Sequence, residues 1–228
     1  MNQSELNGIA KSILPEFTEI LKACYPYQLK GIFHSEMLMF CAIITKLMPE
    51  QVIESGRARG QSTEIIGRWT ESRRIQFHSI ESNTMREDFD IANKRMQGIE
   101  CNLITGDGME LMPKLVKNTK TLCLIDGPKG SNMWKLFQMM ITMPTVQGVA
   151  MHDSYDGSTI RNNLQKAYKG KYLISDDEEF VKAFKHLDEE CWGVHPFEPY
   201  QTGSFIGGVT TNIAPCKSYS GTLSFVEK

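Results

Sequence analysis

The sequence has no long apolar segment and no excess of basic residues. Its longest apolar run extends from Met37 to Thr45, whereas a membrane-spanning helix needs roughly 20 apolar residues. The formal net charge is −2 at pH 7, and proteins that bind nucleic acids usually carry a broad basic face. We therefore expect neither a membrane nor a nucleic acid as the partner of this protein.

Paired-cysteine motifs are absent too. The six cysteines form no Cys-x-x-Cys pair and show no zinc-site spacing: Cys24, Cys41, Cys101, Cys123, Cys191 and Cys216. Scattered cysteines of this kind are typical of a reducing compartment. Residues 1–6 contain no basic region followed by an apolar one, so no signal peptide is expected. Together these features predict a cytoplasmic protein.

The composition that is present is that of an ordinary globular protein. The 228 residues are 41% hydrophobic and 23% charged, which is enough for one domain with a full core. We expect a single domain with three parts. N-terminal helices that form a cap occupy 1–50, a cofactor-binding core occupies 51–160, and a C-terminal helix and strands occupy 161–228.

Short apolar runs alternate with amphipathic segments through the middle of the chain. Strands are predicted at 52–53, 75–80, 101–105, 121–125 and 146–151. Helices are predicted between and after them, at 63–69, 85–96, 109–116 and 134–140. This alternation predicts an α/β fold with a doubly wound, parallel sheet. A further amphipathic helix is predicted at 177–190 and a terminal strand at 205–213.

A glycine-containing turn follows the first predicted strand. An acid, two glycines four apart and a hydroxyl residue occur there, namely Glu54, Gly56, Gly60 and Ser62. Glycine allows a tight turn and a close approach of ligand to backbone. The helix that begins after the turn offers unpaired N–H groups and the positive end of its dipole. The segment therefore predicts a site for a nucleotide-like cofactor.

An acidic residue lies at the carboxyl end of each of the five predicted strands: Glu54, Glu81, Asp107, Asp126 and Asp153. Ligands of open α/β sheets bind along that edge, which favours one shared cleft. Glu81 suits the two hydroxyls of a ribose, although an acid there can also stabilise the next helix through its dipole. Lys129 and His152 follow the same strand ends and are candidate bases, a role for which a lysine needs a lowered pKa.

These residues together resemble the class I S-adenosylmethionine (SAM)-dependent methyltransferases. The family's acid-x-Gly-x-Gly-x-Gly motif is met by Glu54, Gly56, Ala58 and Gly60, with alanine in place of the middle glycine. The form Glu-x-Gly-x-x-x-Gly-x-Ser is similar to that of catechol-type and of bacterial natural-product and sugar O-methyltransferases. The resemblance covers about residues 52–156. It implies a Rossmann-like fold with a seven-stranded sheet and an N-terminal helical extension.

The resemblance also implies roles for particular residues. Those expected to bind SAM are Glu54, Ser55, Gly56, Gly60, Gln61, Ser62, Glu81, Ser82, Gly106, Asp107, Gly108 and Asp126. Catechol-type enzymes end their fourth strand in Asp-x-x-Lys, with the Asp on Mg²⁺ and the Lys as base, and Asp126 and Lys129 match that spacing. Asp153 is the second expected metal ligand. The family's Asp-Asn pair is replaced here by Asp153-Ser154 after His152, so Mg²⁺ stays an open expectation, as does the choice between Lys129 and His152 as base.

The sequence thus predicts a SAM-dependent methyltransferase that acts on a hydroxyl of a small molecule or sugar. Three alternative functions compete with this prediction. An NAD(P)-dependent oxidoreductase is opposed by the absent Gly-x-Gly-x-x-Gly fingerprint. An RNA methyltransferase is opposed by the net charge, and a non-catalytic cofactor-binding protein stays open. Homo-oligomerisation also stays open. The aromatic candidates for lining an acceptor pocket are Trp134, Tyr155, Trp192, His195 and Tyr200.

Overall fold

A computed structural model of the chain describes residues 1–28, 30–82, 85–194 and 222–228. The predicted strand at 205–213 and two of the aromatic candidates, His195 and Tyr200, lie outside these residues. The side chain of Trp192 lies outside them as well.

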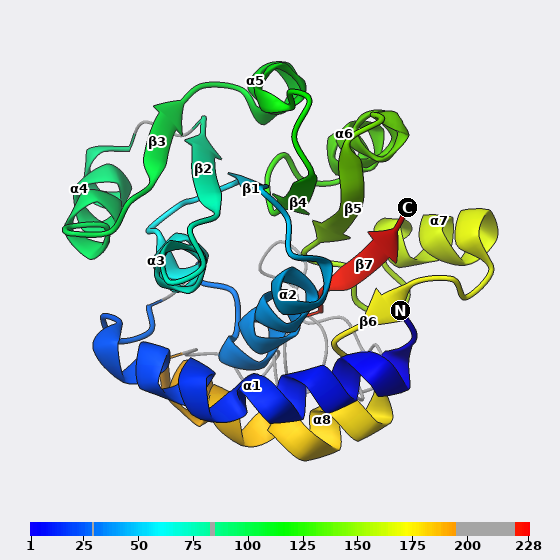
Figure 1. The fold of residues 1–228 in the computed structure, drawn as a ribbon, viewed down its shortest axis with the longest axis horizontal. Coiled ribbons are helices and arrows are strands. Elements are labelled where there is room, and N and C mark those ends of the chain that lie inside the picture. The colour runs from blue at the N-terminus through cyan, green and yellow to red at the C-terminus, as the bar shows by residue number, and fades with distance from the viewer. Residues whose placement is uncertain (29, 83–84, 195–221) are drawn as a thin grey trace, which may run out of the picture.

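One mixed sheet forms the centre of the described structure (Figure 1). Its strands are β1 (Gln51–Ser55), β2 (Gln76–Glu81), β3 (Asn102–Thr105), β4 (Thr121–Ile125), β5 (Val146–Met151), β6 (Leu173–Ile174) and β7 (Ser224–Glu227). The order is β3-β2-β1-β4-β5-β7-β6, and the first five strands are parallel. β7 runs antiparallel to both β5 and β6. The strand order reverses between β1 and β4, the place where open α/β sheets bind ligands.

Helices connect the strands and cover both faces of the sheet. They are α1 (Gln3–Ala23), α2 (His34–Leu47), α3 (Gln61–Glu71), α4 (Arg86–Arg95), α5 (Gly108–Leu115), α6 (Ser131–Thr142), α7 (Thr159–Tyr168), α8 (Glu178–Phe184) and α9 (Glu189–Val194). A short 3₁₀ helix, η1 (Lys185–Asp188), lies between α8 and α9. None of the described helices is long and apolar enough to cross a membrane.

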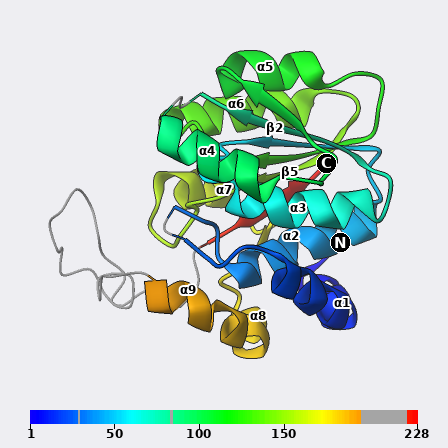
Figure 2. The same cartoon turned by 90° about the vertical axis from the view of Figure 1, so that its left-hand side faces the viewer.

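The alternation of side chains along β4 shows how the two layers form. Leu122 and Leu124 face the core shared with α1, α2, α3 and α8. Cys123 and Ile125 point the other way, into the core shared with α5, α6 and α7. Because neighbouring residues of a strand point to opposite faces, a continuous apolar strand needs helices on both sides. Figures 1 and 2 show these two helical layers, with α1 and α8 on the outer side of α2.

The predicted doubly wound fold with an N-terminal helical extension is confirmed. Two local predictions were wrong. Glu54 belongs to β1 itself and does not follow it, because β1 is longer than the predicted two residues. The single helix predicted at 177–190 is divided into α8, η1 and part of α9.

Candidate active site

The turn after β1 depends on Gly56 and Gly60. Gly56 has φ 100°, and a Cβ there would meet the backbone N of Gly127 and lie 2.7 Å from the backbone carbon of Asp126. Gly60 has φ 78° and is the N-cap of α3. Ala58, in place of the family's middle glycine, takes a left-handed conformation as well, with φ 43°. The turn therefore keeps the backbone path expected of glycines and passes directly over the end of β4.

Glu54 is buried beneath this turn and does not face an open cleft. Its carboxylate accepts hydrogen bonds from the hydroxyls of Ser62, Thr63 and Ser79. Burial raises the pKa of Glu54, and the three hydroxyl donors act in the opposite direction. The side chains of Glu54 and Ser62, predicted to grip the cofactor, are thus paired with each other. In this arrangement they fasten α3 to β1 and β2.

Two neighbouring side chains predicted for the cofactor are also paired within the protein. The Ser55 hydroxyl donates to the carbonyl of Gly127. The Gln61 side-chain nitrogen lies 3.3 Å from Nε2 of His34, whose Nδ1 faces the carbonyl of Leu187. Burial lowers the pKa of His34. A neutral ring that donates from Nδ1 and accepts the Gln61 amide at Nε2 satisfies both contacts.

The start of α3 remains available to a ligand through its backbone. The first N–H groups of a helix have no partner within the helix, and Gly60 brings no side chain to them. Gln61 Oε1 is buried and has no hydrogen-bond partner among the described residues. Donors at the helix start and an orphan acceptor beside them suit a group that carries both a carboxylate and an ammonium.

The ends of β2 and β3 lie next to this turn. Glu81 is half-buried, and one of its oxygens accepts the N–H of Ala58 at 2.6 Å, which fastens the turn to β2. Asp107 caps α5 by accepting the N–H of Met109 at 2.8 Å. Gly108 packs against Ser55, where a Cβ would collide with the hydroxyl. Ser82 is exposed.

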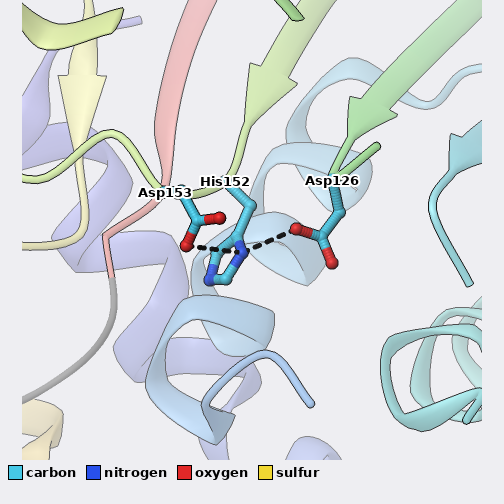
Figure 3. A group of neighbouring side chains, drawn as sticks. All are labelled: Asp126, His152 and Asp153. Atoms are coloured by element: carbon cyan, nitrogen blue, oxygen red, sulfur yellow. Dashed lines mark hydrogen bonds and ion pairs between the residues drawn. The ribbon is translucent and has the colours of Figure 1, made fainter. Parts of the chain in front are cut away.

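The ends of β4 and β5 bring Asp126, Lys129, His152 and Asp153 together (Figure 3 draws three of them). His152 Nδ1 lies 2.7 Å from an oxygen of Asp126 and 3.4 Å from one of Asp153. The Lys129 ammonium contacts the same Asp126 oxygen and lies 2.6 Å from the other oxygen of Asp153. Ile125 and Met151 are register partners in parallel strands, so the residues that follow them lie side by side. Sequence reasoning had placed all four at this edge.

Glu36 is a member of the cluster that sequence reasoning missed. It lies in the first turn of α2, its side chain is 0% exposed, and its Oε1 is 3.4 Å from His152 Nε2. Its other oxygen accepts the N–H of Phe33 at 3.1 Å. The sequence marks Glu36 only as part of a helix start. Its contact with His152 could not be predicted, because 116 residues separate the two along the chain. The imidazole therefore lies between a carboxylate of the sheet and a carboxylate of α2.

Comparisons with known proteins bear on the fold. No protein-family model matches the sequence, and no curated protein sequence matches it. Among solved structures, cofactor-bound Rv0187 from MTB has a TM-score of 0.50 at 16% identity, over 95% of this chain and 89% of that one. A candidate O-methyltransferase from Klebsiella pneumoniae has a TM-score of 0.50 at 13% identity, over 96% and 90%. The O-methyltransferase TomG from Streptomyces achromogenes, in complex with SAM, has a TM-score of 0.49 at 13% identity, over 100% and 91%.

The strand order and the two likenesses with a TM-score of 0.50 decide the fold. The chain has the class I methyltransferase fold. At such identities the likeness extends to the fold alone, and the chemistry has to be argued from the residues of this chain.

Within the methyltransferase fold, the charges around Lys129 and His152 bear on the base roles expected for them, and those roles stay predictions. Burial acts to lower the pKa of Lys129, but Asp126 and Asp153 outweigh it and raise the pKa. Burial likewise acts to lower the pKa of His152, and Glu36, Asp153 and Asp126 raise it well above the ordinary value. The acidic neighbours thus favour the cationic form of both side chains, and in that form neither can take a proton. Burial acts to raise the pKa of Asp126, but His152 and Lys129 lower it below its usual range.

The residues expected to hold Mg²⁺ in such a methyltransferase do not fit that ion as they stand. Asp126 and Asp153 do lie together, with His152 as a third potential ligand. Mg²⁺ prefers an octahedron of oxygens, and an imidazole nitrogen is a poor member of that set. Both carboxylates are already paired with the Lys129 ammonium.

The described aromatic candidates for an acceptor pocket differ in position. Trp134 stacks on Phe137 with ring centroids 4.9 Å apart, so it belongs to the core beside α6. Tyr155 is 44% exposed and follows Asp153 by two residues. Of these two, only Tyr155 remains a candidate for contact with the acceptor.

Proposed function

We propose that this protein is a SAM-dependent methyltransferase that methylates a hydroxyl of a small molecule or sugar. The observation that carries the proposal is a juxtaposition at one sheet edge. The start of α3, which has no side-chain cap, directly follows the Gly56–Gly60 turn, and that turn packs against the strand end that carries Asp126. The fold, the candidate O-methyltransferase from Klebsiella pneumoniae and the cofactor-bound state of Rv0187 support it.

The residues of the turn suit the parts of SAM. The N–H groups at the start of α3 would hold the methionine carboxylate, since helix N-termini attract anions. Gln61 Oε1, buried without a described partner, would accept from the methionine ammonium. Glu81 would accept from the ribose hydroxyls, and Gly106–Gly108 would lie beside the adenine.

The chemistry requires orientation and removal of one proton. SAM supplies a methyl group that is already activated on a sulfonium. The protein holds the acceptor hydroxyl in line with that methyl group, and alignment of this kind removes up to about 7–11 kcal/mol of a barrier. Lys129 and His152, as cations, would stabilise the negative charge that develops on the hydroxyl oxygen. The proton would pass to Asp153, whose side chain is 50% exposed, whereas those of Asp126 and Glu36 are 11% and 0% exposed.

Calorimetric titration with SAM and S-adenosylhomocysteine (SAH) tests the proposal, and NAD is titrated in parallel. We expect saturable binding of SAM and SAH and none of NAD. Glu81→Gln should weaken SAH binding by roughly tenfold, about 1.4 kcal/mol, because one charged acceptor for the ribose is lost. Glu110→Gln is the matched control, since Glu110 is exposed on α5 and pairs only with Lys114 among the described residues.

Binding of NAD in place of SAM would replace the proposal with the oxidoreductase alternative. SAM binding without methyl transfer to any member of a panel of hydroxylated small molecules and sugars would favour the non-catalytic alternative. A small-molecule acceptor, with neither nucleic acid nor membrane as partner, remains part of the proposal, and homo-oligomerisation stays a prediction to be measured. A cytoplasmic setting is proposed on the five described cysteines, which are all free thiols.

A further inference from the structure

We propose that the Lys129 ammonium takes the place of a divalent metal ion in this protein, so that Asp126 and Asp153 bind neither Mg²⁺ nor Mn²⁺. The inference deepens the proposed function, on which it rests for the meaning of the site. It departs from the expectation that the resemblance to catechol-type enzymes raised.

The position of the ammonium is the first step of the argument. Lys129 Nζ contacts Asp126 Oδ1 and lies 2.6 Å from Asp153 Oδ2, so one cation bridges the two carboxylates. A metal ion that bridged these same two oxygens would have to displace the ammonium. The two aspartates come from neighbouring strand ends, and the lysine reaches them from the turn that directly follows Asp126.

The short chain segment between Asp126 and Lys129 makes the ammonium a strong competitor of a dissolved metal ion. Lys129 is three residues from Asp126 along the same turn, so the chain keeps its ammonium within reach of the carboxylates. A tethered group acts at an effective concentration of roughly millimolar or above. A dissolved ion must displace the ammonium and shed part of its own hydration, which Mg²⁺ does reluctantly.

His152 also contacts the Asp126 carboxylate. Its Nδ1 is 2.7 Å from Asp126 Oδ1, the oxygen that Lys129 also contacts. That oxygen thus has two donors for its two lone pairs, and Nδ1 presents a hydrogen there, not a lone pair. Nε2 is the ring nitrogen away from Asp126 (Figure 3), and it lies 3.4 Å from Glu36 Oε1. Nδ1 lies near both aspartates, but it could join a metal site with them only by giving up its hydrogen bond to Asp126.

Metal titration of the purified full chain tests the inference. Mg²⁺ and Mn²⁺ are titrated separately by calorimetry into wild type, Lys129→Met and the control Lys135→Met. Lys135 is exposed on α6 and has no ion pair among the described residues. We expect no saturable binding to wild type or to Lys135→Met at millimolar ion. Lys129→Met should gain saturable Mn²⁺ binding, roughly tenfold or more tighter than any wild-type binding, because the internal competitor is gone.

Two results would overturn the inference. The first is saturable metal binding to wild type that Asp126→Asn abolishes. The second is a Lys129→Met variant that melts as wild type does and gains no metal affinity. Since the Lys129 side chain is 56% exposed, the variant is expected to fold; if it does not, the wild-type titrations and Lys129→Gln still decide. SAH is titrated into the same wild-type sample. A failure of SAH to bind removes the proposed function, whereas the metal titrations judge the role of Lys129 separately.

Discussion

Replacing Gly56 with alanine should damage both the stability of the protein and its cofactor site. The residue has φ 100°, and holding an L-residue in such a conformation costs about 1–3 kcal/mol. The new Cβ would also lie 2.7 Å from the backbone carbon of Asp126, and it would press on the N of Gly127. Forcing backbone apart in a packed region costs about another 1–3 kcal/mol. The sum, about 2–6 kcal/mol, is a large part of the 5–15 kcal/mol typical of a domain.

Urea unfolding followed by circular dichroism measures this loss, and calorimetry with SAH measures the effect on the site. The matched control is Gly8→Ala in α1, where a Cβ meets nothing within 4 Å. Since glycine is a poor helix former, that variant should gain about 0.5–1 kcal/mol. The opposite result is a free energy of unfolding of Gly56→Ala within about 0.5 kcal/mol of the wild-type value. In that case the close approach of Gly56 to Asp126 and Gly127 would not be what requires glycine at this position.

Two further substitutions test buried carboxylates. Glu54→Gln replaces the acceptor of three hydroxyls, so we expect a loss of about 1–3 kcal/mol in urea unfolding; an unchanged midpoint would contradict the network. Burial raises the pKa of Asp188 to about 7, against about 3.9 in an unfolded chain. The folded state therefore holds a proton that the unfolded state releases, and this group's contribution to stability falls as pH rises from about 4 to about 7. Asp188→Asn should thus stabilise the protein at about pH 8 and change little at about pH 4, which thermal melts at the two pH values would check.

The sheet could be predicted from the sequence because its signals are local. Both β4 and β5 have the predicted bounds, since each is an apolar run between turn-forming residues and is buried on both faces. The edge expected to bind ligands follows from the parallel order of the strands, and the binding itself stays a prediction. The strand bounds and the carboxyl edge of the sheet can both be predicted without knowing which distant segments are in contact.

The contacts that shape the site come from distant segments and were beyond local patterns. Ser79, which donates to Glu54, lies 25 residues away on β2. The division of the helix predicted at 177–190 has a similar origin. Asp188 turns toward α2 and accepts the N–H and the hydroxyl of Ser35, while the carbonyl of Leu187 meets His34. An apolar period along one segment carries no information about such partners.

The five strand-end acids were predicted to line one ligand cleft, and the structure gives each a partner within the protein. Glu54 holds α3, Glu81 holds the turn after β1, and Asp107 caps α5. Asp126 and Asp153 share the Lys129 ammonium. The regular pattern therefore has an architectural cause in the first three cases, because a parallel sheet needs its strand-end turns fastened. Under the proposed function, recognition of the cofactor's methionine end would therefore fall mainly to backbone N–H groups, and the charged side chains between β4 and β5 would serve the reacting hydroxyl.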